Sequence, residues 1–167
     1  SSCFILVRPF ATGGNEVFAM GDCGINIKPN EDELVEIAEE TVRCARIFGV
    51  DPKVAFLSYS TYGSGKGEDV DKMRNAARKT KERNPDLPIS GEIQFDAAVS
   101  PRVAKKKCPQ SEVAGNANTF IFPDINAGNI GYKIAQRLGN FEAYGPILLG
   151  LNAPVNDLSR GCNAAEV

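Results

Sequence analysis

Short apolar runs rich in β-branched and aromatic residues alternate along this chain with segments whose apolar positions recur every three or four residues. This alternation is typical of βα units arranged around a parallel or mixed sheet. Near the start, residues 4–7 and 16–20 flank the turn-forming stretch Thr12-Gly-Gly-Asn15, so we expect these two runs to pair as a hairpin. Further strands are predicted at the later apolar runs, which are residues 53–58, the beginning of 89–99, 119–122 and 146–149.

The clearest predicted helix follows Asn30. This residue can cap the helix, Glu33 three positions later completes a capping box, and Gly49 ends the helix. One face carries residues at helical spacing that suit burial: Leu34, Ala38, Thr41, Ala45 and Phe48. Further helices are predicted at residues 68–83, with Val70, Met73 and Ala77 facing inward, at residues 102–107, and at residues 129–138, where Gly139 stops the last one.

Composition and charge narrow the class of protein. The 167 residues, 43% hydrophobic and 24% charged, suffice for one ordinary core, or for one domain and a piece of a second. A net charge of -2 gives no bulk attraction to nucleic acid or to an anionic membrane, so we expect neither as a partner. No apolar run approaches the roughly 18 residues of a membrane span, and the first residues lack a signal-peptide layout, which favours a cytoplasmic protein.

The cysteine and histidine content limits the possible chemistry. Histidine is absent, which excludes a Ser-His-Asp triad, histidine bases and histidine metal ligands within this chain. Proton transfer must therefore use Asp, Glu, Lys, Tyr or Cys. No cluster of residues calls for a metal. The five cysteines form no CxxC pair and favour reduced thiols: Cys3, Cys23, Cys44, Cys108 and Cys162.

The densest group of reactive side chains lies near the C-terminal end. Arg160 offers a planar, permanent cation suited to phosphate oxygens, and Ser159 places a hydroxyl beside it. Gly161 lets a ligand approach the backbone, and Glu166 would share a helical face with Ser159 if the chain turned helical from Gly161. Glu166 is then a candidate base. Local sequence alone explains the serine and arginine equally well as a helix cap and a surface cation, and Glu166 as a solvated residue.

A loop of small and polar residues, Ser60-Thr-Tyr-Gly-Ser-Gly-Lys66, follows the predicted strand at residues 53–58. It is not a P-loop, because Lys66 is followed by Gly67 and not by Ser or Thr. Its amides and hydroxyls could meet a phosphate, or the loop could be a simple connection. We interpret it as the wall of a cleft. The candidate substrate-binding residues in it are Ser60, Thr61, Gly63 and Ser64.

A second polar segment, Asn126-Ala-Gly-Asn-Ile-Gly131, opens the helix that follows the strand at residues 119–122. A helix N-terminus at the carboxyl end of a strand is a favoured ligand position in α/β sheets. Asn126 and Asn129 are therefore candidate substrate contacts, although the glycines there serve helix-to-sheet packing equally well. The charge run at residues 105–107 is interpreted as a solvated face.

Five sequence blocks occur in a fixed order: residues 54–64, 91–98, 122–133, 145–152 and 152–167. In that order they resemble the C-terminal portion of the phosphate acetyltransferases, or phosphotransacetylases, of the phosphate acetyl/butyryltransferase family. The resemblance implies a three-layer α/β/α fold with a mixed, mostly parallel sheet and an isocitrate/isopropylmalate dehydrogenase-like architecture. It also implies that residues 1–154 form the middle α/β domain of the family, and that residues 155–167 begin the return to a first domain whose N-terminal half is absent. The chain alone should then be inactive or nearly so.

The reaction implied by the resemblance moves an acetyl group between acetyl phosphate and coenzyme A, by direct attack of the coenzyme A thiolate. Ser159 and Arg160 would recognise the phosphate and the acyl group. A reaction of this kind belongs to acetate metabolism. The family usually has Asp where this chain has Glu166, which is one methylene longer. Coenzyme A and phosphate are substrates here, no tightly bound cofactor is implied, and a homodimer through the middle domain is expected.

Three alternatives stay open at this point. A phosphate butyryltransferase would have the same chemistry with a larger acyl pocket. A non-catalytic acetyl-CoA-sensing domain, like that of some malic enzymes, would tolerate the change at Glu166, whereas the intact Ser159-Arg160 pair argues against it. A purely structural dimerisation module is the third alternative.

Overall fold

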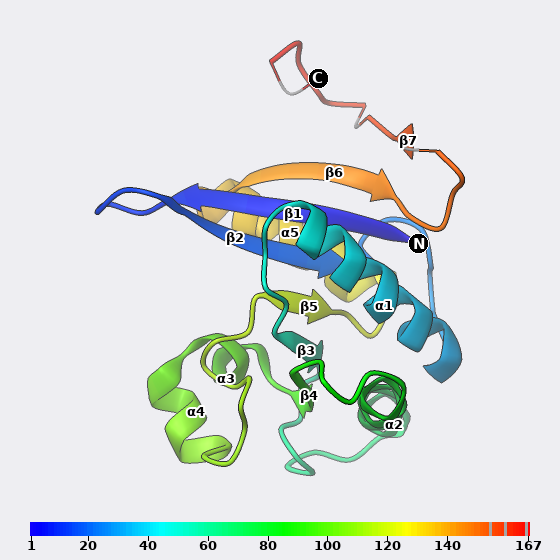
Figure 1. Cartoon of the computed structure of the whole chain (residues 1–167), viewed down its shortest axis with the longest axis vertical. Helices are drawn as coiled ribbons and strands as arrows, with labels where there is room; N and C mark the ends of the chain where they lie inside the picture. The colour runs from blue at the N-terminus through cyan, green and yellow to red at the C-terminus, as the bar shows by residue number, and fades with distance from the viewer. Residues whose placement is uncertain (154, 159, 166) are drawn as a thin grey trace.

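The computed structural model describes residues 1–153, 155–158, 160–165 and 167. A seven-stranded sheet runs through it in the order β4-β3-β5-β2-β1-β6-β7 (Figure 1). The strands in chain order are β1 Ser2–Pro9, β2 Asn15–Gly21, β3 Val54–Leu57, β4 Ile89–Ile93, β5 Thr119–Ile121, β6 Glu142–Leu148 and β7 Val155–Asn156. The hairpin predicted at the start of the chain is confirmed, since β1 and β2 pair antiparallel with Leu6 opposite Phe18.

The two halves of the sheet differ in strand direction. Strands β2, β5, β3 and β4 pair in parallel, as the βα pattern predicts. Strands β1, β6 and β7 add antiparallel pairings at the other side. The expected mixed sheet is confirmed, and among the described residues three strand pairings are parallel and three antiparallel, so half of the pairing and not most of it is parallel. The hairpin joins β1 and β2 directly, whereas the chain reaches β6, beside β1, only after helix α5 (Ile125–Leu138).

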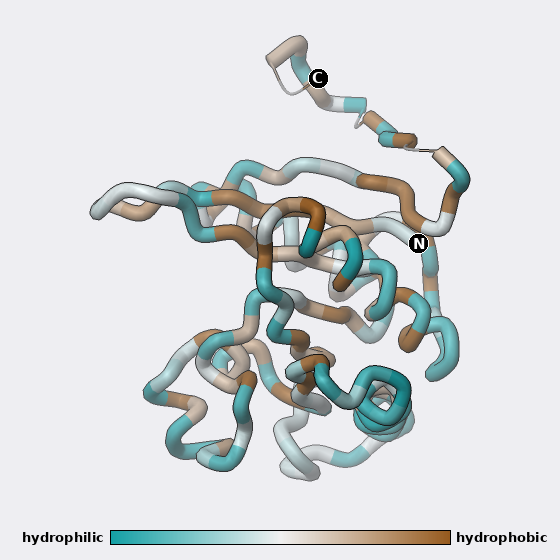
Figure 2. The backbone as a smooth tube through the Cα atoms, in the orientation of Figure 1, coloured by the Kyte–Doolittle hydropathy of each residue, from teal (hydrophilic) through white to brown (hydrophobic). Residues whose placement is uncertain are grey.

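Helices cover both faces of the sheet. Helices α1 Glu31–Ile47 and α2 Glu68–Arg83 lie on the near face in Figure 1, and α5 Ile125–Leu138 lies behind it. Helices α3 Phe95–Val99 and α4 Pro101–Lys107 pack into the same hydrophobic cluster as α5. Figure 2 shows hydrophobic segments on the strands, whereas α2 is hydrophilic over much of its length. Buried side chains alternate between the faces, since Phe56 packs under α1 and α2 and its neighbours in β3 pack under the other helices.

The start of α1 has the predicted capping box. The Glu33 amide donates to the Asn30 side chain at 2.9 Å, and the Asn30 amide donates to the Glu33 carboxylate at 2.8 Å. Leu34 and the three following positions of the predicted inner face are buried. Phe48 is an exception, because it lies just past the helix end and its side chain remains 49% exposed.

Helix α5 begins four residues earlier than the sequence predicts, because Asp124 caps it by accepting from the Ala127 amide at 2.9 Å. Close packing holds this end of the helix. A Cβ atom added to Gly128 would lie 2.6 Å from the backbone oxygen of Asp22 and 3.1 Å from the Cα of Cys23. The helix therefore needs glycine here to reach the turn after β2.

Replacing Gly128 by alanine should lower the free energy of unfolding by about 1–3 kcal/mol, because two backbone segments would have to separate. The sign of this change in the free energy of unfolding is informative, because helix propensity alone favours alanine over glycine by about 1 kcal/mol and would stabilise the protein. Urea-induced unfolding followed by circular dichroism measures the change. Lys133→Ala, on an exposed position of the same helix, is the control and should stay within about 0.5 kcal/mol. A Gly128→Ala protein as stable as the parent would contradict this packing.

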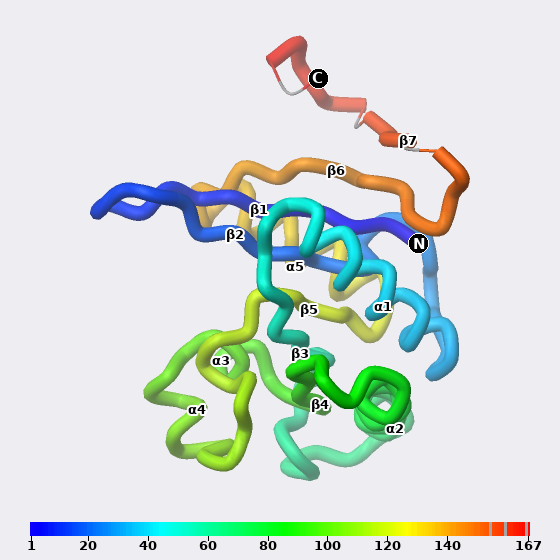
Figure 3. The backbone as a smooth tube through the Cα atoms, viewed as in Figure 1, coloured from blue at the N-terminus to red at the C-terminus, as the bar shows by residue number. Residues whose placement is uncertain are grey.

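The loops at the carboxyl ends of β2, β3, β4 and β5 share one edge of the sheet, because these strands are parallel. The C-terminal segment lies elsewhere. Figure 3 shows it extending beyond β6 and β7, away from α2, α3 and α4. Strand β6 is only partly buried in this chain, so the buried strand predicted at residues 146–149 is wrong in that respect.

Candidate functional site

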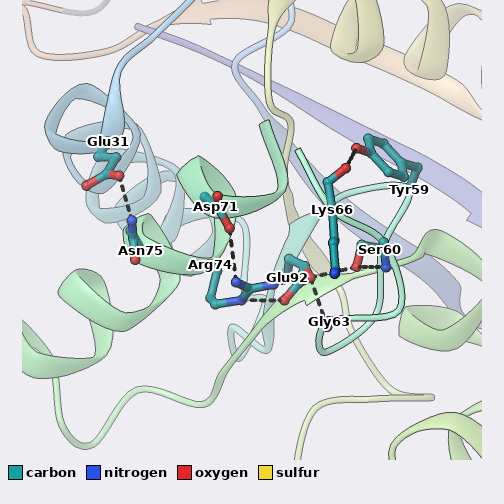
Figure 4. A network of polar contacts seen from close by, with 10 residues as sticks. Glu31, Tyr59, Ser60, Gly63, Lys66, Asp71, Arg74, Asn75 and Glu92 are labelled. Atoms are coloured by element: carbon teal, nitrogen blue, oxygen red, sulfur yellow. Dashed lines mark hydrogen bonds and ion pairs between the residues drawn. The ribbon is translucent and has the colours of Figure 1, made fainter. Parts of the chain in front are cut away.

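A buried carboxylate organises the edge of the sheet at the end of β4. The side chain of Glu92 is 1% exposed and lies between α2 and the loop that follows β3 (Figure 4). One carboxylate oxygen accepts from the Ser60 hydroxyl at 2.7 Å and from the Gly63 amide at 3.2 Å. Arg74 donates from Nε at 3.0 Å and from a terminal nitrogen at 3.2 Å. Four donors therefore converge on one carboxylate from two separate segments.

The charge of Glu92 is stabilised by these donors. Burial alone raises the pKa of Glu92, but the hydrogen bonds from Arg74 and Ser60 outweigh it and hold that pKa below the usual value. The same contact raises the pKa of Arg74. Arg74 also reaches Asp71 on its own helix at 3.1 Å, so it bridges α2 to the end of β4. The ion pair is therefore fully charged at neutral pH.

The loop after β3 is held in shape by its own hydrogen bonds. The Ser60 hydroxyl, which donates to Glu92, also accepts from the Gly65 amide at 2.8 Å. The Thr61 amide donates to the Ser64 hydroxyl at 3.0 Å, and the Thr61 hydroxyl accepts from the Gln94 amide at 2.9 Å. The structure thus brings together all four residues that the sequence proposes here, but their polar groups bind the protein itself. The loop amides are therefore occupied within the protein and do not form an open anion cradle.

Two aromatic side chains are exposed on this loop, in addition to Gly63, Ser64 and Lys66. Tyr59 is 62% exposed and Tyr62 is 49% exposed, although both are anchored. The Tyr59 hydroxyl donates to the carbonyl of Lys66 at 2.7 Å, and the Tyr62 hydroxyl bonds the hydroxyl of Ser90. Two tyrosine rings therefore face solvent from a loop whose backbone is fastened to β4.

A second buried carboxylate shapes the loop after β2. Asp22 is 3% exposed and accepts hydrogen bonds from the Ser2 hydroxyl and from the amides of Gly24, Ile25 and Asn26. The Asn26 side chain adds another donor at 2.6 Å. Burial raises the pKa of Asp22, yet these donors together hold it below its usual value.

The two candidate asparagines of α5 differ in their surroundings. Asn126 is exposed in the first turn, as a ligand contact requires. The Asn129 side chain donates to the Cys23 carbonyl at 3.2 Å, which ties α5 to the Asp22 loop. Lys72 on α2 similarly donates to the carbonyl of Pro123 at 2.8 Å. Side-chain hydrogen bonds therefore connect the loops at this edge to the neighbouring helices.

The predicted catalytic segment lies at the opposite end of the sheet from this edge network. Arg160 is exposed, and Ser159 and Glu166 lie outside the described residues. Strand β3 and strand β7 are separated by five strand spacings, or roughly 24 Å at about 4.8 Å each. This chain therefore does not bring Arg160 to the Ser60 loop.

A hollow of about 480 Å³ lies between α5, β6 and the C-terminal segment. Tyr132, whose ring stacks on Phe4 with centroids 4.0 Å apart, forms part of its wall. Lys133 and Arg137 line it from the same helix, and Gly161 and Cys162 line it from the C-terminal segment. Positive side chains of α5 thus face the segment that carries Arg160.

The described residues contain no group of three or more Cys, Asp or Glu side chains able to hold a metal ion. Within the same residues, no helix is long and apolar enough to cross a membrane. The cysteines are free thiols, and Cys3, Cys23, Cys44 and Cys108 are buried. Burial raises the pKa of Cys23 far above its ordinary value, which disfavours a thiolate there.

Sequence reasoning missed the roles of Glu92 and Asp22. Each is a carboxylate placed directly beside the buried residues of a strand, where water is excluded. That placement was the available signal, since an acidic residue there needs donors from elsewhere. Ser60 lies 32 residues from Glu92 and Ser2 lies 20 residues from Asp22, so periodicity does not reveal these partners. The other donors to Asp22 come from residues within four positions of it.

Comparison with known sequences identifies the relatives of the chain. The model of the phosphate acetyl/butaryl transferase family matches residues 1–167. The phosphate acetyltransferase of Bacillus subtilis (strain 168) is 55% identical over 167 residues, which are 100% of this chain and 50% of that protein. The phosphate acetyltransferase of Corynebacterium glutamicum is 52% identical over 167 residues, which are 100% of this chain and 49% of that protein. The chain thus spans about half the length of the curated relatives it matches.

Solved structures agree with the sequence matches. A phosphotransacetylase from Streptococcus pyogenes superposes with a TM-score of 0.92 and 56% identity, covering 99% of this chain and 50% of that one. A branched-chain phosphotransacylase from Enterococcus faecalis V583 is more distant, with a TM-score of 0.77, 27% identity, and coverage of 96% and 57%. The resemblance inferred from the sequence blocks is confirmed: the chain belongs to the phosphate acetyl/butaryl transferase family.

Proposed function

We propose that the protein to which this chain belongs is a phosphate acetyltransferase, which moves an acetyl group between acetyl phosphate and coenzyme A. The observation that carries this proposal is the 55% identity over all 167 residues with a phosphate acetyltransferase. The 27% identity with the branched-chain transacylase favours acetyl over larger acyl groups. Both substrates belong to acetate metabolism, and a cytoplasmic location follows from that role.

The proposed chemistry assigns separate tasks to the candidate residues. The coenzyme A thiolate attacks the acetyl carbonyl, the carbon–oxygen bond to phosphate breaks, and inorganic phosphate leaves. Glu166 takes the thiol proton, Arg160 neutralises charge on the phosphate, and Ser159 hydrogen-bonds the developing oxyanion or the sulfur. These steps use no resident cofactor or metal. The Ser60 loop would form one wall of the cleft, and Asn126 and Asn129 would stand beside it.

We assign residues 1–154 to the middle domain of the family and residues 155–167 to the segment that crosses to the first domain. The dehydrogenase-like architecture implied by the resemblance is part of this assignment. The separation of Arg160 from the Ser60 loop supports it, since a site that uses both must involve further protein or a second subunit. The fragment alone should accordingly be inactive or nearly so.

The test uses the full-length parent protein. Loss of the free thiol of coenzyme A is followed with acetyl phosphate as the acyl donor, and butyryl phosphate is the comparison substrate. We expect turnover with acetyl phosphate at least tenfold more efficient than with butyryl phosphate, since a pocket discriminates against two extra methylenes by about 1–3 kcal/mol or more. Faster turnover of the butyryl substrate would indicate the butyryltransferase. A parent that binds acetyl-CoA without turnover would indicate the sensing domain.

A homodimer through this domain is also proposed. Helix α5 carries an exposed apolar stripe at helical spacing, formed by Ile130 (57% exposed), Ile134 (54%) and Leu138 (80%). Exposure of these apolar side chains to water along three successive turns is unfavourable in the isolated chain. A self-complementary interface between two subunits would remove that exposure.

Replacing Ile134 by aspartate should weaken the dimer of the full-length protein by on the order of 100-fold, because a two-fold interface would bury the charge twice. Sedimentation velocity over a range of protein concentrations measures the change. Glu36→Lys, an exposed charge change on α1, is the control and should leave the oligomeric state unchanged. An Ile134→Asp protein that remains as dimeric as the parent would exclude α5 as the interface.

A further inference from the structure

We propose that Glu92, held by Arg74, is a positioning residue that sets the shape of the loop at residues 58–67 as a wall for coenzyme A. The inference rests on the proposed function for the identity of the ligand. The contacts of Glu92 themselves are independent of that function, as four donors from the loop and from α2 converge on its carboxylate.

The loop depends on this carboxylate for its conformation. Ser60 reaches inward to Glu92 and at the same time holds the Gly65 amide, so one contact fastens both sides of the loop. The Gly63 amide, at a glycine with φ of +87°, points to the same carboxylate oxygen. The Tyr62 amide donates to the Glu92 carbonyl at 3.2 Å. Loss of the carboxylate would therefore release the middle of the loop together with both of its sides.

The exposed chemistry of the loop favours coenzyme A over acetyl phosphate as its ligand. The amides of residues 60–65 donate to groups within the protein, which leaves them committed and not aimed at an anion. The surface offered outward includes the rings of Tyr59 and Tyr62, together with the exposed Ser64 and Lys66. Aromatic faces stack on nucleobases and pack on apolar chains, and coenzyme A has both, whereas acetyl phosphate is a compact anion.

Arg74 explains how Glu92 remains charged in a buried position. A buried carboxylate without a partner would take up a proton or draw in water. Arg74 is 43% exposed and approaches from α2, so it neutralises the charge while its other side meets Asp71. The pair thereby connects the loop to a helix that is itself packed on α1 through buried Met73 and Ala76.

The test is Glu92→Gln in the full-length parent protein. Glutamine is close in size but has one acceptor oxygen and an NH₂ group, so it must place a donor against a donor. We expect the KM for coenzyme A to rise about tenfold or more, while kcat and the KM for acetyl phosphate change less than about threefold. Glu82→Gln, an exposed carboxylate that pairs with Arg78 on the same helix, is the matched control and should change none of these.

Two further measurements separate this inference from the proposed function. Hydrogen exchange at the amides of Gly63 and Gly65 should accelerate in Glu92→Gln while exchange in β1 and β2 stays slow, whatever the parent catalyses. Calorimetric titration with coenzyme A should show about tenfold weaker binding in the variant. If the parent protein shows no turnover of acetyl phosphate, while Glu92→Gln still exchanges faster at Gly63 and Gly65 and binds coenzyme A more weakly, the proposed function fails and the positioning role stands.

Milder and complementary variants guard against a protein that fails to fold. Ser60→Ala removes one of the four donors to Glu92, together with the acceptor of the Gly65 amide, and should produce a smaller effect in the same direction on the KM for coenzyme A. Tyr59→Ala should raise that KM, while Tyr59→Phe, which keeps the ring, should stay within about threefold of the parent. Equal effects of Glu92→Gln on both substrates, or unchanged affinity for coenzyme A in folded Glu92→Gln and Ser60→Ala proteins, would overturn the inference.

Discussion

Arg160→Ala in the full-length parent protein should lower kcat/KM for acetyl transfer to coenzyme A by about 10²–10³-fold. The guanidinium is the permanent cation beside the candidate serine, and it is exposed in this chain and so open to a ligand. Removing it would leave charge on the phosphate or the oxyanion without a preorganised partner in the transition state. The rate of acetyl-CoA formation from acetyl phosphate and coenzyme A measures the loss.

Two companion variants give the Arg160 result its meaning. Arg160→Lys keeps the charge but not the planar fork, so an intermediate loss is expected if two phosphate or oxyanion contacts are made at once. Arg102→Ala removes an exposed arginine of α4 and should leave the rate within about twofold. An Arg160→Ala enzyme within threefold of the parent would reject the proposed role, provided that fold and oligomeric state are retained.

Asp22→Ala should lower the free energy of unfolding by about 3–5 kcal/mol, which is a large part of the stability of an ordinary domain. Five donors from four residues converge on this buried carboxylate, and alanine would leave the buried Ser2 hydroxyl and four part-buried donors of the following loop without their acceptor. Urea-induced unfolding at neutral pH measures the loss. Asp32→Ala is the control, because Asp32 is an exposed carboxylate at the start of α1 that pairs with Lys79.

The pH dependence provides a second check on Asp22. Its pKa is lower in the folded protein than in the unfolded chain, so its charge contributes stability above about pH 3.9, the ordinary pKa of aspartate. That contribution is lost as the pH falls through the lower folded pKa. Asp22→Asn should therefore flatten the stability profile in this acidic range. A parallel profile displaced by a constant amount would mean that the ionisation of Asp22 is not coupled to folding.

Much of the fold follows from local patterns. The capping box at Asn30 and the inward residues of α2 are confirmed, because caps and helical periodicity involve neighbours within four residues. The start of α5 was predicted too late, since the cap at Asp124 competes with the glycines that follow it. The antiparallel half of the sheet was underestimated, as pairing partners such as β1 and β6 are far apart in the sequence.

The candidate site was predicted less completely than the fold. The family blocks indicated the Ser60 loop and the C-terminal segment as parts of the site. The structure shows that the Ser60 hydroxyl donates a hydrogen bond to Glu92. Ser159 and Glu166 lie outside the described residues, so their roles stay predictions. The direction in which Ser60 and Thr61 point was not predictable, because a hydroxyl in a loop serves an external ligand or an internal acceptor with the same local sequence.

The amino-acid sequence by itself determined the types and order of most elements, the cap of α1 and the family, because these depend on neighbouring residues and on ordered sequence blocks. Only the tertiary structure decided that Glu92 and Asp22 each gather donors from separate segments, and that Arg160 and the Ser60 loop occupy opposite ends of the sheet. The physical reason is that a buried charge is tolerated only where packing supplies its partners. Packing joins residues whose separation along the chain carries no local signal.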